Sequence, residues 1–208
     1  MQARASRRTA RTQAERSAAT TERLHASARR LFATKGYAAT SLAEIVADAG
    51  LTKGAIYHHF VNKEEVFREV FEREQRALVQ VVSEAARGET DPWKAFTAGW
   101  QAFVEASQEP SVRRITLVEA PIALGWERVR LIGSSYTLAL VESGLSRAMD
   151  AGRVARRPVR PLARLVFAAM CEGSLIIAGA ADQQSARRQV ADSVGALLSG
   201  LEPRPPGS

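Results

Sequence analysis

Residues 40–63 read TSLAEIVADAGLTKGAIYHHFVNK, and this stretch decides the fold. Ser41 and Glu44 have the spacing of a capping box, in which an N-cap hydroxyl and a carboxylate three residues later satisfy the first N–H groups of a helix. Apolar residues then recur on one helical face, at Leu42, Ile45, Val46 and Ala49. Gly50 ends this helix, because glycine readily takes the left-handed conformation found after a last helical turn.

A second short helix follows directly. Thr52 is placed to cap it, and Leu51 is placed to pack against it from the preceding position. We predict a helix from Lys53 to about Phe60, with Ile56 and Phe60 facing inward. The outward-facing side consists of Lys53, Gly54, Tyr57 and His58.

A third helix start comes a few residues later. Asn62 and Glu65 repeat the capping-box spacing, so another helix begins at Lys63. Two short helices joined by a glycine-containing turn predict a helix-turn-helix, whose second helix enters the major groove of DNA.

The distribution of charge supports a nucleic-acid partner. The chain has 29 Lys and Arg against 22 Asp and Glu, a net charge of +7. Residues 1–63 hold 11 of the basic and four of the acidic residues, so residues 64–208 hold 18 of each. A basic segment that coincides with a helix-turn-helix indicates a polyanion as partner, and a basic tail kept for solubility is the alternative.

Composition argues against several classes of protein. With 46% hydrophobic residues, a chain of 208 residues can build a sizeable core. The single cysteine, Cys171, lies in an apolar run and is expected in that core, so we expect no disulfide and no metal site. Charged residues interrupt the apolar runs of residues 162–181, and no signal-peptide core follows the Arg-rich N-terminus. We therefore expect a cytoplasmic protein with no membrane span.

No enzyme signature is present in the sequence. The three histidines, at positions 25, 58 and 59, have no partner at catalytic or metal-ligand spacing. There is no Gly-rich phosphate loop, no GxSxG and no HExxH. We therefore expect no catalytic residues and no cofactor.

The rest of the chain reads as helix, without sustained strand alternation. We predict an all-α fold of about nine helices, with an N-terminal three-helix domain and a C-terminal helical domain. The predicted divisions are a disordered basic arm (1–13), the helix-turn-helix domain (14–62), a linking helix (63–88), the C-terminal domain (89–201) and a disordered tail (202–208). Within the C-terminal domain we expect a helix over 111–119, a break over 120–126 and one continuous helix over 127–150.

Residues 22–67 resemble the N-terminal domain of the TetR family of bacterial transcriptional regulators. The matching positions are Ala28, Leu31–Phe32, Gly36–Tyr37, Thr40–Ser41, Ile45, Ala49–Gly50, Leu51–Gly54, Ile56–Phe60 and Asn62–Glu64. The resemblance implies an all-helical protein, in which three helices bind DNA and a fourth leads to a ligand-binding and dimerisation domain. It names no ligand, because the C-terminal domains of this family diverge widely.

Carried over by position, the DNA contacts of the family fall on Thr40, Ser41, Thr52, Lys53, Gly54, Tyr57, His58 and Lys63. Hydroxyls and backbone N–H groups at helix starts bind phosphates. Lys53 is the candidate for reading a guanine edge, and Gly54 allows the backbone to approach DNA closely. For Tyr57, packing of the ring on the first helix is the alternative.

The last two predicted helices carry apolar stripes with small residues between them. The resemblance implies that they pack against their copies in a homodimer, as a four-helix bundle. The predicted interface consists of Leu165, Ala169, Gly173, Ile176, Val190, Val194 and Leu197. Packing within one chain is the alternative for each of these residues.

Aromatic and soft apolar residues also gather in the C-terminal domain. Ligand pockets are mostly apolar with a few polar anchors. We therefore predict an effector pocket lined by Trp100, Phe103, Glu119, Trp126, Tyr136, Phe167 and Met170. Ordinary core packing is the alternative.

We interpret these patterns as a homodimeric transcriptional regulator that represses from a near-palindromic operator on double-stranded DNA and is released by a small hydrophobic effector. Two alternatives stay open. A TetR-fold architectural or nucleoid-associated protein would need no effector, and absence of a closed C-terminal cavity would favour it. A helical enzyme would need a converging acid–base pair in that cavity.

Overall fold

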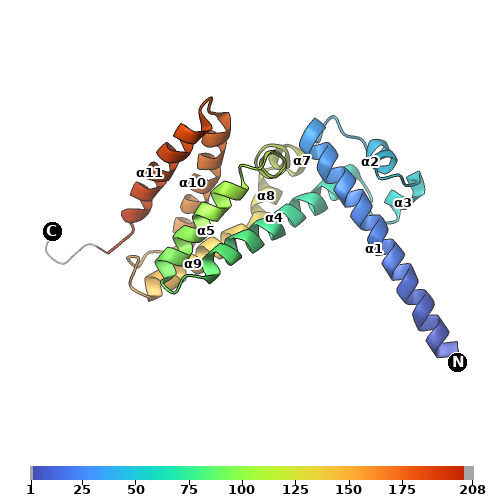
Figure 1. Ribbon diagram of the computed structural model, residues 1–208, viewed down its shortest axis with the longest axis horizontal. Helices are drawn as coiled ribbons and strands as arrows, with labels where there is room; N and C mark the ends of the chain where they lie inside the picture. Colours follow the sequence, from blue (N-terminus) through green and yellow to red (C-terminus); the bar gives the residue numbers. More distant parts are fainter. Residues whose placement is uncertain (1, 204–208) are drawn as a thin grey trace.

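The computed structural model describes residues 2–203, and in that range it consists of helices joined by turns and loops, without strands (Figure 1). In the first helix, side chains are described at Glu15 and from Ser17 onward. The N-terminal part comprises α1 (Gln2–Lys35), α2 (Leu42–Asp48), α3 (Lys53–Tyr57) and α4 (Lys63–Arg87). The C-terminal part comprises α5 (Pro92–Ala106), α6 (Pro110–Arg113), the π-helical segment η1 (Arg114–Glu119), α7 (Ala120–Leu124), α8 (Trp126–Ser134), α9 (Thr137–Asp150), α10 (Val159–Gly179) and α11 (Gln183–Ser199). The predicted all-α fold class is confirmed.

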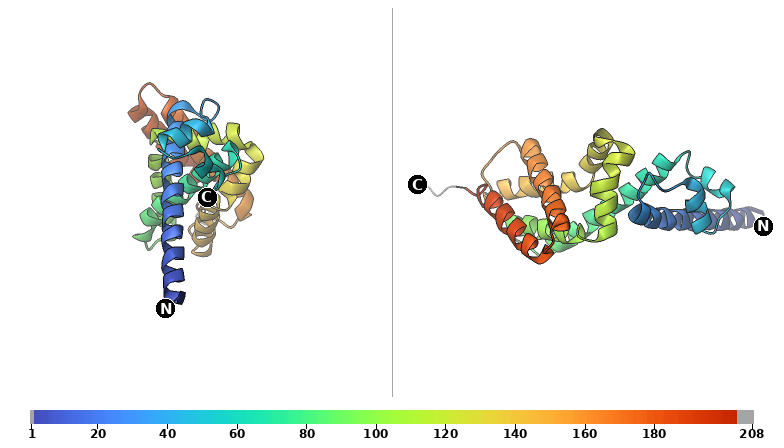
Figure 2. Two further views of the ribbon diagram at one scale, coloured as in Figure 1. Left: turned by 90° about the vertical axis from the view of Figure 1, so that its right-hand side faces the viewer. Right: turned by 90° about the horizontal axis from the view of Figure 1, so that it is seen from above.

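The molecule is elongated, with α2 and α3 at one end and α10 and α11 at the other (Figures 1 and 2). Helix α4 runs between the two ends, and the N-terminal half of α1 projects beyond the body of the protein as a free rod. The surface of the helix-turn-helix and the surface of the last two helices are therefore well separated in space.

The start signals read from the sequence are largely confirmed. The Ser41 hydroxyl accepts from the Glu44 N–H at 3.2 Å, and the Glu44 carboxylate accepts from the Ser41 N–H at 2.8 Å, so the capping box is complete. Asn62 caps α4 by accepting from the Glu65 N–H at 2.8 Å. Thr52 occupies the N-cap of α3 but its hydroxyl makes no capping bond, so that expectation is wrong.

The first hydrophobic core lies under the helix-turn-helix and reaches beyond it. Its centre is an aromatic cluster in which Phe32 and Phe67 meet edge to face at 5.0 Å, and Tyr37 and Phe67 at 5.3 Å between ring centroids. Buried residues from α1–α4 surround this cluster. Three residues of the C-terminal part complete it, namely Ile115, Ala120 and Leu124. The two parts of the chain thus share one core.

The second core lies between α5, α9, α10 and α11. Phe103 and Phe167 meet edge to face at 5.9 Å, and Leu145 and Ile177 are fully or almost fully buried. Cys171 packs against this core as predicted, and burial raises the pKa of its thiol to about 12. A thiol held in its protonated form is a poor nucleophile and a poor metal ligand.

Several predicted element boundaries are wrong. The chain expected to be a disordered arm (1–13) is helical from residue 2 onward, as part of α1. Residues 2–35 contain neither glycine nor proline and are rich in Ala and Arg, so nothing in them breaks the helix. The recognition helix ends at Tyr57 and not at Phe60. Of the predicted tail (202–208), residues 204–208 lie outside the described residues.

The middle of the C-terminal part also differs from the prediction. The helix expected over 127–150 is split into α8 and α9 at Ser135 and Tyr136, directly after the weak helix formers Gly133 and Ser134. The break expected over 120–126 contains a short helix, α7. Its Pro121 lacks an N–H and crowds the carbonyl four residues earlier, which accounts for the wider π-helical turn of η1 just before it.

Helix α10 is long and apolar enough to cross a membrane by length and composition, with a mean hydropathy of 1.6 over its most apolar window, and it is the one such helix among the described residues. This is weak support for a membrane span, since core helices of soluble proteins pass the same test. Only 28% of that window is buried in the chain. Leu165 and Ile176 are 71% and 52% exposed on it, so α10 has an uncovered apolar face.

Candidate DNA interface and ligand cavity

Six of the eight predicted DNA contacts lie on one exposed surface of the helix-turn-helix. Ser41 starts α2, Thr52 precedes α3, and the other four lie on or directly after α3. All six are exposed: Ser41, Thr52, Lys53, Gly54, Tyr57 and His58. Tyr57 keeps 55% of its surface exposed, so its ring is not packed away against α1. The arrangement offers hydroxyls, one ammonium and two aromatic rings to a partner.

Thr40 and Lys63 differ from the other six. Thr40 is 1% exposed, and its hydroxyl donates to the Gly36 carbonyl at 2.8 Å. A side chain buried in this way cannot contact DNA, so Thr40 closes the loop between α1 and α2 instead. Lys63 is half-buried, donates to the Tyr37 carbonyl at 2.9 Å and lies 4.3 Å from the centre of the Tyr37 ring.

Side chains of α1 hold the helix-turn-helix in place, and sequence reasoning missed them. An Arg23 Nη donates to the Ala49 carbonyl at 2.6 Å and to the Gly50 carbonyl at 3.1 Å, where α2 ends. Ser27 donates to the Ile45 carbonyl at 3.0 Å and contacts the Asp48 carboxylate at 2.5 Å. The Arg23 bonds satisfy carbonyls that the end of a helix leaves unpaired, whereas the Ile45 carbonyl also accepts from the Ala49 N–H at 2.9 Å. An Arg and a Ser one turn apart on α1 give no recognisable sequence signal.

Glu44 shows how strongly the start of α2 is fixed. Its carboxylate accepts from Lys35 at 2.8 Å as well as from Ser41. The Lys35 hydrogen bond, followed by the bonds from Ser41, lowers the pKa of Glu44 to about 2. The carboxylate therefore stays charged, and the helix start stays capped, at any physiological pH.

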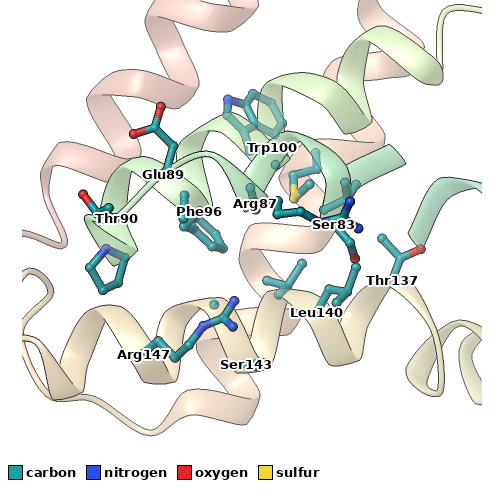
Figure 3. A pocket seen from close by; sticks show the side chains of 18 residues that line it. Ser83, Arg87, Glu89, Thr90, Phe96, Trp100, Thr137, Leu140, Ser143 and Arg147 are labelled. Atoms are coloured by element: carbon teal, nitrogen blue, oxygen red, sulfur yellow. The ribbon is translucent and has the colours of Figure 1, made fainter. Parts of the chain in front are cut away.

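A cavity of about 440 Å³ lies between α4, α5 and α9, with Met170 of α10 at its side (Figure 3). Its apolar part includes Phe96, Trp100 and Val141. Two glycines shape it: a Cβ at Gly144 would lie 2.7 Å from the Phe96 ring, and a Cβ at Gly99 would lie 3.1 Å from a Val82 methyl. Because neither glycine has a side chain, α9 and α4 can approach α5 closely at these points.

Only two of the seven predicted pocket residues, Trp100 and Met170, line this cavity. A second cavity, of about 300 Å³, lies on the other side of Trp100, against α10 and α11. The other five predicted residues line neither of the two. Phe103 and Phe167 pack against each other in the core, and Trp126 is 67% exposed. The Tyr136 hydroxyl accepts from Arg76 at 3.4 Å, and Glu119 faces the N-terminal part.

The comparison with known proteins agrees with the helix-turn-helix and with the helical C-terminal part. Residues 24–70 match the family described as bacterial regulatory proteins, tetR family, and residues 93–201 match the tetracyclin repressor-like C-terminal domain. The chain belongs to the TetR family. TetR-family proteins are DNA-binding transcriptional regulators and not enzymes, so the protein is a transcriptional regulator with a DNA-binding helix-turn-helix.

Individual relatives resemble the chain over different lengths. A solved TetR-family regulator from Pectobacterium atrosepticum has a TM-score of 0.76 and 27% identity, over 92% of this chain and 98% of that one. The transposon Tn10 TetC protein of Escherichia coli is 28% identical over 60% of this chain and 62% of TetC. The transcriptional regulator AcrR of Shigella flexneri is 51% identical over 21% of this chain and 20% of AcrR. The chain thus spans less than two thirds of the length of TetC and AcrR.

In this TetR-family regulator, Glu119 joins the two parts of the chain. It is 7% exposed and accepts from the backbone N–H of Tyr37 at 2.8 Å and from Arg114 Nε at 3.2 Å. Arg114 also donates to the Thr34 carbonyl at 2.7 Å. A Cβ at Gly36, whose φ is +89°, would lie 2.6 Å from Glu119 Oε1. The loop between α1 and α2 is therefore clamped onto η1.

A second polar link connects the same two parts. Arg29 of α1 contacts Glu74 of α4 at 2.5 Å and Glu109, which caps α6, at 3.6 Å. Glu74 is 5% exposed, and its hydrogen bond to Arg29 raises the pKa of the guanidinium. The Arg29 guanidinium therefore keeps its positive charge beside Glu74.

The predicted dimer residues of this TetR-family regulator fall into two groups, one buried within the chain and one exposed. Gly173, Val190 and Val194 are buried between α10 and α11, and a Cβ at Gly173 would lie 2.8 Å from a Val190 methyl. These three belong to packing within the chain, so their assignment to the interface is wrong. Leu165, Ile176 and Leu197 are 71%, 52% and 66% exposed, and Ala169 is half-buried. Among the described residues, no group of three or more His, Cys, Asp or Glu could hold a metal ion.

Proposed function

We propose that the protein is a cytoplasmic, homodimeric repressor that binds a near-palindromic DNA operator and releases it when a small hydrophobic effector binds in the C-terminal cavity. The observation that carries the proposal is the course of α4. Its first half contributes Phe67 and Phe71 to the core beneath the helix-turn-helix, and its second half contributes Ser83 and Arg87 to the wall of the 440 Å³ cavity. One rigid helix thus connects a DNA-reading surface to a ligand-sized space.

The proposed DNA surface is the exposed set Ser41, Thr52, Lys53, Gly54, Tyr57 and His58. Hydroxyls and the tyrosine OH suit phosphates, and Lys53 suits the acceptor edge of a guanine. Lys63 has its ammonium fixed by Tyr37, so it would meet a phosphate at little further cost in side-chain entropy. Thr40 is left out of this set and shapes the loop.

The proposed dimer interface is the uncovered apolar face of α10 and α11. Each of Leu165, Ile176 and Leu197 exposes more than half of its surface there. Large exposed apolar patches on soluble proteins mark surfaces that bind a partner. A twofold dimer through this face would place two helix-turn-helix units at the outer ends of the assembly. Such symmetry requires an operator with two related half-sites.

The proposed release mechanism uses the clamped loop. An effector that prefers one position of α4 and α5 would shift α4, η1 or both. Helix α4 contacts α1 through Glu74 and Arg29, and η1 contacts the loop between α1 and α2 through Glu119. By linkage, an effector lowers operator affinity by the same factor by which the operator lowers effector affinity.

The test begins with sequencing of genomic DNA fragments captured by the purified protein. We expect a near-palindromic motif with half-site centres roughly 34–36 Å apart, or a small multiple of this. Affinity for that motif should fall steeply with salt, by about 0.9 in the log–log slope for each phosphate neutralised. Captured fragments without a shared motif would instead support an architectural DNA-binding protein. Binding that does not depend on salt would contradict both the repressor and the architectural function.

A further inference from the structure

The cavity between α4, α5 and α9 has an uneven distribution of charge. Its inner part is apolar, formed by Phe96, Trp100 and Met170, which are at most 9% exposed. Its rim carries two exposed arginines from different walls, Arg87 of α4 and Arg147 of α9. A ligand that reaches both regions must be amphipathic.

The two rim arginines are not engaged elsewhere. Within the described part of the chain, neither guanidinium forms an ion pair or donates a hydrogen bond. Neighbouring arginines do find carboxylates: Arg153 contacts Asp91 at 2.8 Å, and Arg156 contacts Asp150 at 3.2 Å. Arg87 and Arg147 therefore keep all their donors for a ligand.

Negative charge on the protein does little to cancel these arginines. Glu89 is the one acidic residue among those that line the cavity, and it is exposed. Figure 3 shows its carboxylate pointing away from the cavity, whereas the Arg147 side chain extends from α9 toward Phe96. The rim is thus positive on the side that a ligand would face.

We propose that the cavity binds an organic anion, with an apolar body against Phe96 and Trp100, a carboxylate at the rim held by Arg147, and further positive charge from Arg87 on the α4 wall. The proposal names the chemical class of the effector and so rests on the proposed function. A volume of about 440 Å³ is within the range of small-molecule pockets. Arginine is the residue best suited to a carboxylate, because its planar fork can donate two parallel hydrogen bonds. Ser83 and Ser143 line the same cavity and can supply further hydrogen bonds.

A neutral compound of the same shape would leave the arginines without a new partner. Hydrogen bonds between ionised groups are roughly twice as strong as those between neutral groups. The cavity should therefore discriminate an acid from its amide, even when their apolar bodies are identical. This discrimination is the property that the proposal predicts and that a purely hydrophobic effector site would lack.

The test is isothermal titration calorimetry of the full chain without DNA, with 2-naphthoate against 2-naphthamide and decanoate against decanamide. We expect at least one acid to bind at least tenfold more tightly than its amide. Arg87→Ala and Arg147→Ala should each reduce this preference at least fivefold and leave amide binding within twofold. Arg87→Lys and Arg147→Lys retain the charge and should lose less. Arg130→Ala removes an exposed arginine of α8 that does not line the cavity, and it should change nothing.

The proposal is overturned if acid and amide bind equally, if the preference survives in both alanine variants, or if none of the four compounds binds. Operator release is measured separately, by fluorescence anisotropy of labelled DNA. An acid that binds through the arginines without releasing DNA supports the anion site and contradicts the repressor mechanism. A neutral compound that binds in the cavity and releases DNA equally well from both alanine variants supports the repressor mechanism and contradicts the anion site.

Discussion

Replacing Glu119 by alanine tests whether the two parts of the protein are clamped together as described. The carboxylate accepts from the Tyr37 N–H at 2.8 Å and from Arg114 at 3.2 Å. Without it, the Tyr37 N–H loses its partner in a buried region, which costs about 1–3 kcal/mol. The Arg114 contribution is small, because that side chain is 37% exposed and keeps its bond to the Thr34 carbonyl.

Glu119→Ala should therefore destabilise the protein by about 1–3 kcal/mol, which for a chain of this size lowers the melting temperature by roughly 2–4 °C per kcal/mol. The assay is thermal denaturation followed by circular dichroism, with urea denaturation as a second measurement. The matched control is Glu84→Ala, because Glu84 is exposed and, among the described residues, accepts from the Gln80 amide alone. A melting temperature equal to that of the control would refute the reasoning.

Gly36 provides an independent check of the same contact. In Gly36→Ala the new Cβ would lie 2.6 Å from Glu119 Oε1, and the residue would keep a φ of +89°. In the Glu119→Ala background the clash with the carboxylate disappears, and what remains is the contact with the flexible Arg114 side chain at 2.9 Å and the backbone strain, about 1–2 kcal/mol. The double variant should therefore be more stable than the sum of the single effects predicts. Strict additivity would show that the carboxylate does not occupy the space beside Gly36.

Three further predictions concern the DNA surface, the dimer and pH. Lys63→Ala should weaken binding to all DNA sequences alike and flatten the salt slope by about one unit. Lys53→Ala should in addition relax the preference at one base position, at a cost of about 1–3 kcal/mol for the cognate site. Titrations against single-base operator variants measure both effects, and a uniform loss of affinity in both variants would make Lys53 a phosphate contact. Leu165→Glu with Leu197→Glu should give a folded monomer by sedimentation velocity with much weaker operator binding, and a persistent dimer would place the interface elsewhere. Burial, and then the nearby Arg73 charge, lower the pKa of His25 to about 4, so the unfolded chain takes up a proton below pH 6.5 that the folded chain refuses. Stability should therefore fall as the pH drops from about 6.5 to about 4, by about 3 kcal/mol in all, and His25→Gln should reduce this dependence; an equal pH dependence in both proteins would contradict it.

The helix-turn-helix was predictable because its signals are local. The Ser41–Glu44 capping box, the turn at Gly50 and the cap at Asn62 each depend on residues within four positions of one another, and the structure contains all three. Thr52 shows the limit of such signals, because a capping residue in the correct position makes no bond.

The cavity was harder to predict, because it depends on which helices meet. Aromatic residues were correctly expected to gather in the C-terminal part, but Phe103 packs in the core and Trp126 faces outward. The spacing of the helices around the cavity depends instead on Gly99 and Gly144, which let α4 and α9 approach α5, and the charge at its rim comes from arginines 60 residues apart. The periodicity of apolar residues shows that a helix has an apolar face, but it does not show whether that face packs within the chain or against a second copy. This is why the sequence places Val190 in the dimer interface although it is buried within the chain.

The shared core beneath the helix-turn-helix limits how such regulators can be recombined. Ile115, Ala120 and Leu124 come from the C-terminal part and are at most 8% exposed in the core that α1 and α4 form. A chimera joined at Gly88 would keep the DNA-reading helices of one parent and receive those three positions from the other. Unless the second parent supplies side chains of matching volume at these positions, the chimera will have a cavity or a steric clash in the core beneath the helix-turn-helix. The transplantable unit is therefore residues 14–88 together with the segment 114–124, two stretches that are distant in sequence and contiguous in space.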